Sequence, residues 1–279
     1  MKAPQEQYLV FTGVDGSVFD PELSCLQKIL PALELLRSRE IPLILSTVQT
    51  SQTVLPFVKA LDHHDPFIVE HGAAIYVPSN AFKVDFKHQI IQDDFKVIQL
   101  GLDRTAIVDR IRSLREDIGL PIYGYSEISE ASKPDGFNPE PDELIRAQSY
   151  QYSEPIFLRS GSADVETVSQ KALEAGLRIM PWGRNFILTG DHDEGSAVLF
   201  ITQLYREEFP HKSIVSIGLC DTARNARMLY AVDIPVLIRR GDNKFDEQVG
   251  RRGMRFTREA GADGWNKAII ALITKDPEA

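Results

Sequence analysis

Residues 8–17 read YLVFTGVDGS, an apolar run that ends in a glycine-rich turn. Such a run is typical of a buried strand that delivers the residues after it to the mouth of an α/β sheet. Apolar residues then recur at helical spacing between 21 and 39, and a second short apolar run follows at 41–45. A strand, a helix and a strand in this order predict a βαβ unit, which favours a parallel sheet with right-handed crossovers. We therefore expect a functional site in the loops at the carboxyl edge of that sheet.

Length and charge limit what the chain can be. Its 279 residues are enough to bury a large core, and we interpret them as two domains. With 31 Lys and Arg residues against 40 Asp and Glu residues, the formal net charge is −9. This charge argues against binding to nucleic acid or to an anionic membrane surface, and a small anionic ligand would need a local basic pocket.

The two cysteines and the N-terminal residues indicate a compartment. Cys25 and Cys220 lie far apart, without the closely spaced pattern of secreted disulfide scaffolds. Residues 1–7 lack the apolar stretch of a signal peptide, and no window approaches the roughly 18 apolar residues of a membrane span. We expect a cytoplasmic protein.

The pattern of elements changes twice along the chain. After a third short strand at 67–69, the alternation of strands and helices stops at about Tyr76, and the stretch 126–142 has no periodicity. The alternation returns at about residue 190. Between these points we expect helices at 103–119 and 163–175 and strands at 156–158, 178–181 and 186–188; after them we expect helices at 195–209, 223–230 and 265–273 and strands at 213–219 and 234–238.

These elements predict an α/β fold with two domains. The core is a doubly wound parallel-sheet, Rossmann-like domain formed by residues 1–80 and 188–279. Residues 81–187 are predicted to form an inserted α+β domain, because strands, helices and loops are mixed there.

The segment from Gly13 to Ser17 resembles the first motif of the haloacid dehalogenase superfamily, DxDG[TS]. An inserted cap domain between the second and third motifs is also the organisation of the cap-bearing members. Finer details resemble mannosyl-3-phosphoglycerate phosphatases, and their order and spacing cover nearly the whole chain. These details are Ser153-Glu154-Pro155, the Gly183-Arg184 turn, the stretch from Gly190 to Gly195, and Gly261-x-x-Gly264-Trp265-Asn266.

The resemblance implies a Mg²⁺-dependent phosphomonoesterase. In this family the first aspartate attacks phosphorus and holds Mg²⁺, and the residue two positions later is the general acid and base. A hydroxyl of the second motif holds a phosphoryl oxygen, a lysine of the third neutralises charge, and an acidic fourth motif completes the metal site. Phosphoryl transfer needs an in-line nucleophile and cations, and Mg²⁺ prefers hard oxygen ligands.

The first two motifs match only in part. Gly13 stands where the nucleophile belongs, so no aspartyl-phosphate can form there. Asp15 matches the general acid and base, although Asp-Gly after a strand is also a common turn. Thr47 stands where the phosphate-holding hydroxyl belongs, or else caps the following turn. Ser17 completes the first motif.

The third and fourth motifs also depart from the family pattern. Glu194 replaces the lysine, and we expect it to be an exposed residue of a first helical turn, where it favours the helix dipole. Asp221 survives as a metal ligand, whereas Asn225 replaces a carboxylate and Arg224 adds a cation. We therefore expect a site formed by Asp15, Asp221 and Asn225 to bind Mg²⁺ weakly or not at all.

Two further groups of residues remain to be placed. We expect Ser153, Glu154 and Arg184 of the cap to contact a ligand, although Arg184 is equally explained as a surface cation beside a turn. Cys220 is expected to be a small buried residue rather than a nucleophile. His71, which follows Glu70 after the third strand, is expected to be a hydrogen-bonded structural histidine.

Three hypotheses follow for function. The first is a pseudophosphatase that binds a sugar phosphate or phosphoglycerate through Thr47, Ser17 and Arg184 without hydrolysing it. The second is a phosphomonoesterase of altered mechanism, in which Asp15 activates water and Arg224 replaces the lysine. The third is a structural or regulatory subunit whose protein partner is unknown. None of them involves nucleic acid or a membrane.

Overall fold

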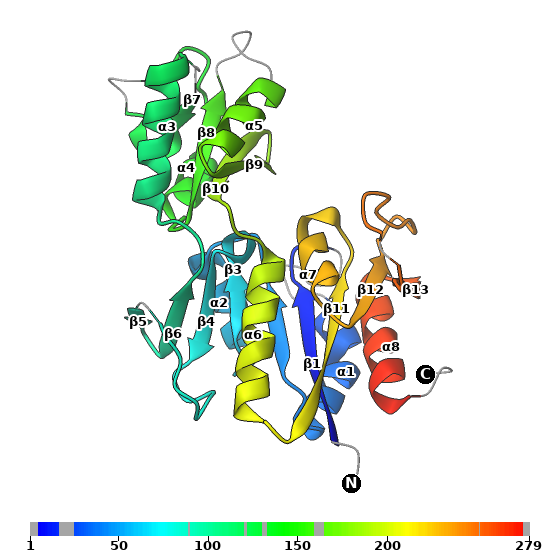
Figure 1. Ribbon diagram of the computed structural model, residues 1–279. Coiled ribbons are helices and arrows are strands. Elements are labelled where there is room, and N and C mark those ends of the chain that lie inside the picture. Colours follow the sequence, from blue (N-terminus) through cyan, green and yellow to red (C-terminus); the bar gives the residue numbers. More distant parts are fainter. Residues whose placement is uncertain are drawn as a thin grey trace. The chain divides into compact units, whose positions relative to one another are not determined.

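A computed structural model describes residues 5–16, 25–88, 90–119, 122–129, 133–158, 165–250 and 252–275. The chain divides into two compact units. The first, called the core, comprises Met1–Gln99 and Asp193–Ala279, and the second, called the cap, comprises Leu100–His192 (Figure 1).

The core is built on a nine-stranded sheet in the order β13-β12-β11-β1-β2-β3-β4-β6-β5. The six strands from β13 to β3 are parallel, whereas β4, β6 and β5 continue the sheet in antiparallel pairs. The bounds are β1 (Gln5–Gly13), β2 (Leu43–Ser46), β3 (Phe67–Val69), β4 (Ala74–Pro78), β5 (Ile90–Gln92), β6 (Phe95–Gln99), β11 (Lys212–Cys220), β12 (Ile234–Arg239) and β13 (Arg255–Ala260).

Strand β1 lies at the centre of the parallel part. It pairs with β2 on one side and with β11 on the other, so the chain leaves it in both directions across the sheet. Its apolar run is fully buried, because Leu9, Val10 and Phe11 are 0% exposed. Open α/β sheets bind ligands at such a switch point, beyond the carboxyl ends of the strands. Gly13 ends β1 there and pairs with Ser46.

Helices cover the sheet on both faces. In Figure 1, α6 lies in front of the strands and α1 lies behind them. The core helices are α1 (Leu26–Ser38), α2 (Ser51–Ala60), α6 (Glu194–Glu208), α7 (Ala226–Tyr230) and α8 (Gly261–Thr274), with short 3₁₀ turns η1 (Glu70–Gly72) and η3 (Ala223–Asn225).

A tryptophan of α8 anchors that helix to the end of β1. Trp265 is fully buried, and its indole Nε1 donates to Thr12 Oγ1 at 2.9 Å, one residue before Gly13. A side chain at Gly264 would lie 2.2 Å from the carbonyl oxygen of Glu259, so only glycine allows this approach of α8 to β13. The position of the end of β1 therefore depends in part on the glycine and tryptophan in the first turn of α8.

The cap is an α+β unit with its own core. Its antiparallel sheet has the order β7-β8-β10-β9, and a cluster that includes Ile107, Ile111, Ile156 and Leu188 fills the space between sheet and helices. The bounds are β7 (Ile122–Gly124), β8 (Ser153–Leu158), β9 (Leu177–Trp182), β10 (Asn185–Gly190), α3 (Arg104–Ile118), α4 (Pro141–Gln148), α5 (Val165–Glu174) and η2 (Tyr125–Glu127).

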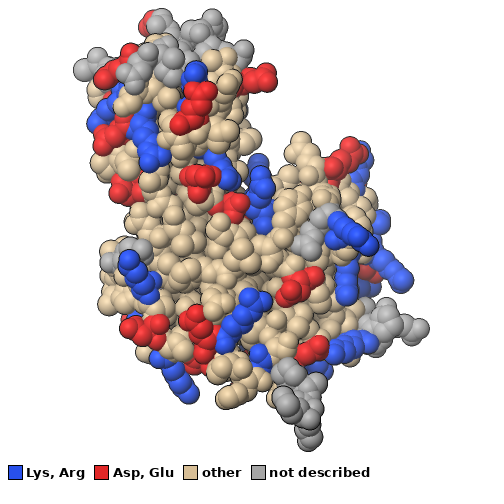
Figure 2. Space-filling model, viewed as in Figure 1, with Lys and Arg blue, Asp and Glu red and all other residues tan. Residues whose placement is uncertain are grey.

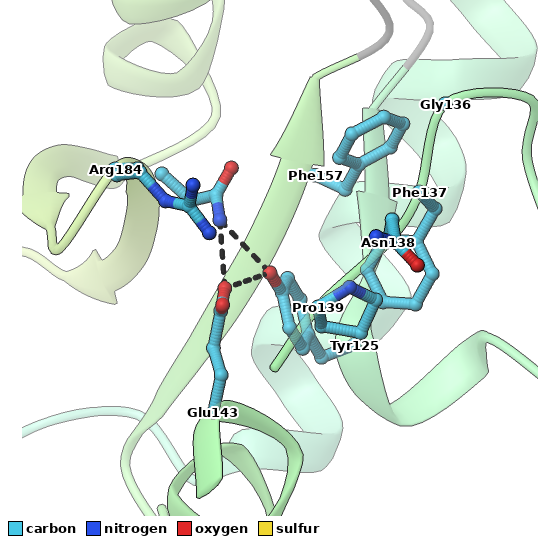
Figure 3. A pocket seen from close by; sticks show the side chains of 9 residues that line it. Tyr125, Gly136, Phe137, Asn138, Pro139, Glu143, Phe157 and Arg184 are labelled. Carbon is cyan, nitrogen blue, oxygen red and sulfur yellow. Dashed lines mark hydrogen bonds between the residues drawn. The ribbon is translucent and has the colours of Figure 1, made fainter. Parts of the chain in front are cut away.

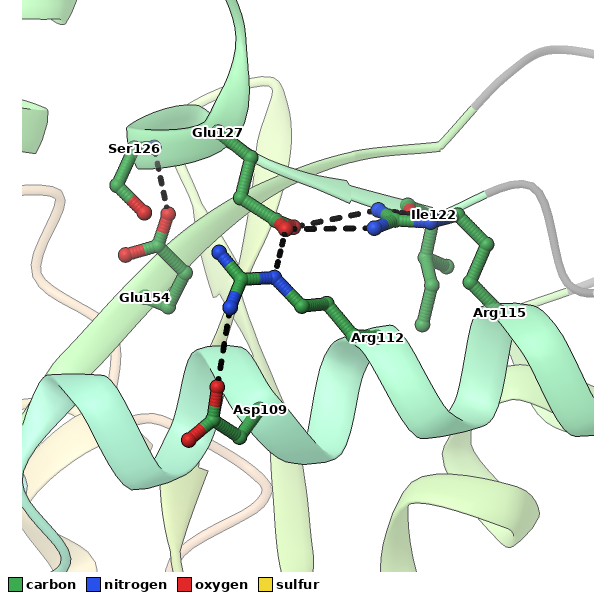
Figure 4. Close-up of polar contacts among 7 residues, drawn as sticks. All are labelled: Asp109, Arg112, Arg115, Ile122, Ser126, Glu127 and Glu154. Carbon is green, nitrogen blue, oxygen red and sulfur yellow. Dashed lines mark hydrogen bonds and ion pairs between the residues drawn. The ribbon is translucent and has the colours of Figure 1, made fainter.

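Ion pairs fasten α3 to the segment after β7 (Figure 4). Glu127 Oε1 lies 2.7 Å from Arg112 Nε, and Glu127 Oε2 lies 3.2 Å from Arg115 Nη1. Arg115 also donates to the carbonyl of Ile122 at 3.2 Å. Because one carboxylate receives two guanidinium groups, the turn that follows β7 is fixed on the helix.

The predicted fold class is confirmed: a Rossmann-like α/β core carries an inserted α+β cap. The compact units divide at Gln99 and Asp193, later than the predicted domain limits at residues 80 and 188. The difference arises because β5 and β6 hydrogen bond to the edge of the core sheet through β4. Helix α4 and strand β13 were not expected from the sequence.

The surface carries charged side chains of both signs, as the composition predicts. Figure 2 shows Lys and Arg side chains interspersed with Asp and Glu on the viewed face of both units. In the part of the chain that the structure describes, no helix has the length and apolar character to cross a membrane.

The loop between α2 and β3 holds two titratable groups with opposite behaviour. Asp65 Oδ2 accepts a hydrogen bond from the amide of Leu43 at 2.9 Å, at the start of β2. Burial raises the pKa of Asp65 to about 6 and lowers the pKa of His63 to about 4. The contribution of Asp65 to stability is therefore present below its unfolded pKa of about 3.9 and lost as the pH rises through 6. The contribution of His63 is present above about 6.5 and lost as the pH falls through 4.

We predict that, in the Asp65→Asn variant, the pH dependence of the free energy of unfolding follows the titration of His63. The two contributions offset each other in the wild type, so the variant should gain stability steadily from pH 4 to 6.5 and exceed the wild type at pH 7.5 by roughly 1–2 kcal/mol, allowing for solvent screening. Urea unfolding at pH 4.5, 5.5 and 7.5 measures this. Asp62→Asn, at an exposed position of the same loop, is the control and should leave the pH dependence unchanged. An identical pH dependence in Asp65→Asn would contradict the assignment.

Candidate functional site

The end of β1 is tightly enclosed, so a side chain at position 13 would require its neighbours to shift. A Cβ atom at Gly13 would lie 3.0 Å from Asn225 Oδ1 and 3.2 Å from the Cβ of Cys220. Gly13 does not have a positive φ, so its backbone does not require glycine. Asn225 is fully buried and fills the space into which an aspartate at position 13 would extend.

Asp15 is held by the segment that follows β2. Its Oδ1 accepts a hydrogen bond from Thr47 Oγ1 at 2.8 Å, and its Oδ2 accepts one from the amide of Val48 at 2.7 Å. Burial raises the pKa of Asp15, although these hydrogen bonds act in the opposite direction. Thr47 Oγ1 also accepts from the amide of Gln49 at 3.0 Å. The hydroxyl expected to hold a phosphoryl oxygen is thus directed at Asp15.

The carboxylate of Asp221 lies against the turn after Asp15. A Cβ atom at Gly16 would lie 2.1 Å from Asp221 Oδ1, so glycine is required there by this close approach. Asp221 is buried, with 4% of its surface exposed. The structure therefore brings Asp15, Asp221 and Asn225 to one edge of the sheet. Ser17, the remaining residue of the first motif, lies outside the described residues.

Glu194 is buried, and the expectation of an exposed first-turn residue is wrong. Only 2% of its surface is exposed, and its Oε1 lies 3.7 Å from Nδ1 of the buried His71. Neither atom has a hydrogen-bond partner among the described residues. Asp193 caps α6 by accepting from the amide of Ser196 at 2.9 Å, which leaves the next side chain, Glu194, directed inward. The hydrogen bond expected for a structural histidine is not made by Nδ1 of His71, which faces Glu194 instead.

The segment that covers Glu194 has a strained backbone. Glu70, His71 and Gly72 have φ values of 48°, 60° and 90°, in the left-handed region that side chains rarely adopt. The amide of Glu70 donates to the carbonyl of Gln49 at 2.9 Å, which ties this turn to the loop after β2. Strained residues persist only where their surroundings fix them, and they gather at functional sites. The sequence signal was the Glu-His-Gly triplet directly after a strand.

The site has a negative electrostatic character. Burial is the main cause that raises the pKa of Asp15 and of the Cys220 thiol, and the carboxylate of Glu194 makes a smaller contribution in the same direction to both. For Cys220 the larger cause is burial, so its thiol stays protonated. Arg224, on η3, is exposed.

The oxygen donors at this edge of the sheet are only partly charged. Among the described residues, no three His, Cys, Asp or Glu side chains are grouped as metal ligands. Both oxygens of Asp15 already accept protein hydrogen bonds, and Asn225 offers an uncharged amide whose Oδ1 and Nδ2 have no described partner. Affinity for a hard cation such as Mg²⁺ follows the number and charge of its oxygen ligands.

The cap residues named from the sequence have different surroundings. Glu154 is fully buried, pairs with Arg104 and accepts from the amide of Ser126 at 2.8 Å, so a structural role explains it (Figure 4). Ser153 is also fully buried. Arg184 is exposed and lines a pocket within the cap.

Comparisons with known proteins agree with this architecture. The haloacid dehalogenase-like hydrolase family matches residues 10–104. The chain is 32% identical over 274 residues to a glucosyl-3-phosphoglycerate/mannosyl-3-phosphoglycerate phosphatase of Methanococcoides burtonii, covering 97% of this chain and 98% of that protein. It is 27% identical to a protein of the same name from Persephonella marina, covering 96% and 97%.

A solved structure shares the fold across both units. A protein of Thermoplasma acidophilum superposes with a TM-score of 0.63 at 13% identity, covering 97% of this chain and 99% of that one. The Methanococcoides burtonii protein matches at 32% identity over nearly the whole length of both chains, and the family matches at residues 10–104. Together these two matches establish the family. The chain belongs to the haloacid dehalogenase-like hydrolases and, within them, is mannosyl-3-phosphoglycerate phosphatase-like.

Proposed function

We propose that this protein is a pseudophosphatase, which keeps the fold of a mannosyl-3-phosphoglycerate phosphatase but has lost the standard phosphatase activity and acts by binding a ligand or by regulation. The observation that carries the proposal is Gly13 at the end of β1, with Asn225 in the space of the missing side chain. In-line phosphoryl transfer needs a nucleophile at this point of the fold, and glycine offers none.

The charge of the site supports the same proposal. A phosphomonoester brings roughly two negative charges at neutral pH. It would meet Glu194 where the family has a lysine, beside Asp15 and Asp221, without the Mg²⁺ that normally offsets phosphoryl charge. We therefore propose weak or absent Mg²⁺ binding as well, and any sugar phosphate or phosphoglycerate ligand would be held by groups other than Glu194.

One alternative has its own support. The relatives are named as phosphatases of glucosyl- and mannosyl-3-phosphoglycerate, and Asp15 is held in a fixed position by Thr47 and Val48. A phosphomonoesterase of altered mechanism would use Asp15 to activate water and Arg224 as its cation. This alternative predicts turnover that depends on Asp15.

We predict no phosphate release from mannosyl- or glucosyl-3-phosphoglycerate by the wild type with Mg²⁺, above a control without protein. The reason is the absent nucleophile, and a sensitive assay for inorganic phosphate over many hours measures it. Turnover by the wild type that Asp15→Asn abolishes would replace the proposal by the altered-mechanism enzyme. Turnover unchanged in Asp15→Asn would indicate a contaminating phosphatase.

We predict that Gly13→Asp combined with Asn225→Asp makes stability depend on Mg²⁺. Gly13→Asp alone should lower stability by about 1–3 kcal/mol, because its Cβ meets Asn225 and Cys220. With Asn225→Asp added, two adjacent carboxylates repel unless a cation binds, so Mg²⁺ should raise the thermal midpoint by about 2–5 °C. Gly13→Asn is the matched control, because asparagine has the size of aspartate without its charge. This variant should show no effect of Mg²⁺ on the thermal midpoint. A Mg²⁺ effect of equal size in the wild type would contradict the weak-metal proposal.

We predict that phosphatase activity appears only when Glu194→Lys is added to those two substitutions. Nucleophile, cation and metal ligands act as a unit, so partial combinations should release no phosphate. Steady-state assays of the single, double and triple variants with mannosyl-3-phosphoglycerate measure this. Activity in Glu194→Lys alone would show that the native site already contains a working nucleophile.

A further inference from the structure

Strand β13 is the last strand of the core sheet and has a free edge. Among the described residues it pairs only with β12, and no backbone–backbone hydrogen bond joins 255–259 to any other described segment. Two strands, β12 and β11, separate it from β1 and Gly13 (Figure 1). A strand with an unpaired edge presents N–H and C=O groups to which another chain can hydrogen bond.

A groove of about 280 Å³ lies between β13 and α8. All the residues that line it belong to the core, so its geometry does not depend on the cap. The apolar part of the lining comprises the buried Val236 of β12 and the half-buried Ala268, Ala271 and Leu272 of α8. The groove therefore places apolar surface directly beside the free strand edge.

An exposed phenylalanine extends this apolar surface. Phe256 of β13 also lines the groove and is 55% exposed. Its ring packs edge-on against Phe245, with the centroids 5.0 Å apart, and the guanidinium of Arg239 lies 5.1 Å from the centroid of Phe245. Phe256 is thus held in place, so a partner can bury it at little cost in conformational entropy.

The charged residues of the groove give it a positive charge. Arg255 and Arg258 line it, are exposed, and form no hydrogen bond or ion pair with any described residue. The carboxylate in the lining, Glu259, is already paired with Lys267 at 2.6 Å. Residues 239–258 read RRGDNKFDEQVGRRGMRFTR, with seven Lys and Arg against three Asp and Glu, in a chain whose net charge is −9. Figure 2 shows Lys and Arg side chains over the part of the core where Figure 1 draws β13.

Protection of the edge explains only part of this arrangement. Charged side chains on an edge strand commonly prevent aggregation, and Arg255 and Arg258 fit that role. Protection does not explain the exposed Phe256 or the apolar lining beside it, because both add the kind of surface that protection removes. A docking surface explains the arginines and the apolar residues together.

The occupant that fits is an extended acidic peptide. An incoming strand would satisfy the free edge of β13, its carboxylates would meet Arg255 and Arg258, and its alternate apolar side chains would bury Phe256 and the groove. A second copy of β13 fits less well, since it would bring its own two arginines to the same edge, and like charges across paired strands are destabilising.

We propose that the groove between β13 and α8 docks an extended acidic segment of a partner protein, which adds a strand to the edge of the core sheet. This interaction goes beyond the proposed function of the core site, and it holds whether or not that site is catalytically silent.

Fluorescence anisotropy of the full chain with a fluorescein-labelled synthetic peptide, DVEVDIEV, tests the proposal. We expect saturable binding with a Kd on the order of 100 μM at low salt, weakened several-fold when the ionic strength rises to about 0.3 M. Two matched peptides should not bind at up to about 1 mM: KVKVRIKV, which reverses the charge, and DVPVDPEV, in which proline removes N–H groups needed for pairing. No saturable binding of DVEVDIEV, or equal binding of either matched peptide, would overturn the proposal.

Variants and hydrogen exchange assign the binding to β13. Arg255→Gln combined with Arg258→Gln should weaken peptide binding about tenfold, because two exposed charge pairs are lost. Arg146→Gln combined with Arg206→Gln removes the same charge at exposed positions of α4 and α6 and should bind as the wild type. Bound DVEVDIEV should also slow amide hydrogen exchange in 255–259 of the wild type.

Three results would refute this assignment. They are equal affinity in the folded Arg255→Gln and Arg258→Gln double variant, unchanged hydrogen exchange in 255–259, and a dimer of the free chain that the peptide does not dissociate in sedimentation experiments. The last result would assign the groove to a second copy of this chain.

Discussion

The close approach of the Asn225 side chain to position 13 constrains the whole core site. The amide lies 3.0 Å from where a side chain at position 13 would begin, so the two positions share one volume. A carboxylate at both positions is tolerated only with a cation between them, and the loss of one carboxylate changes what the other position can hold. The side chains that positions 13 and 225 can hold are therefore coupled, and an asparagine at 225 has the shape of an aspartate without its charge.

The inverted charge at position 194 has an equally local cause. Asp193 caps α6, and a side chain at Gly72 would lie 2.3 Å from the Asp193 carbonyl, so the strained turn η1 closes directly over the start of the helix. Glu194 is therefore almost fully buried and faces His71, 3.7 Å away. Its Oε1 has no hydrogen-bond partner among the described residues, and a buried acceptor left in this way costs roughly 1–3 kcal/mol.

Local sequence patterns predicted the elements that are buried on both faces. Parallel strands such as β1 are short apolar runs between helical periods, and these are visible without a structure. Strands β5 and β6 lie in the segment 81–187 that the sequence assigned to the inserted domain, because their attachment to the core sheet depends on pairing with β4. The burial of Glu194 depends on its contact with η1, and the polar cluster of the cap joins Tyr125, Glu143 and Asn185, which are distant in sequence (Figure 3). The Gly264-Trp265 pair, in contrast, resembled a family signature and proves to be a packing device.

Several buried polar atoms of the core site lack hydrogen-bond partners. Ser46 Oγ, His71 Nδ1, Glu194 Oε1 and both polar atoms of Asn225 are buried without a partner among the described residues. In the cap, Tyr125, Asn185 and Glu143 hydrogen bond to one another, although Ser153 Oγ is buried there without a described partner. A satisfied network rigidifies a site, whereas each buried group without a partner calls for an explanation, such as a functional role or a bound water or ion. The polar atoms beside Gly13 and η1 are therefore the ones in the core that a ligand would have to satisfy.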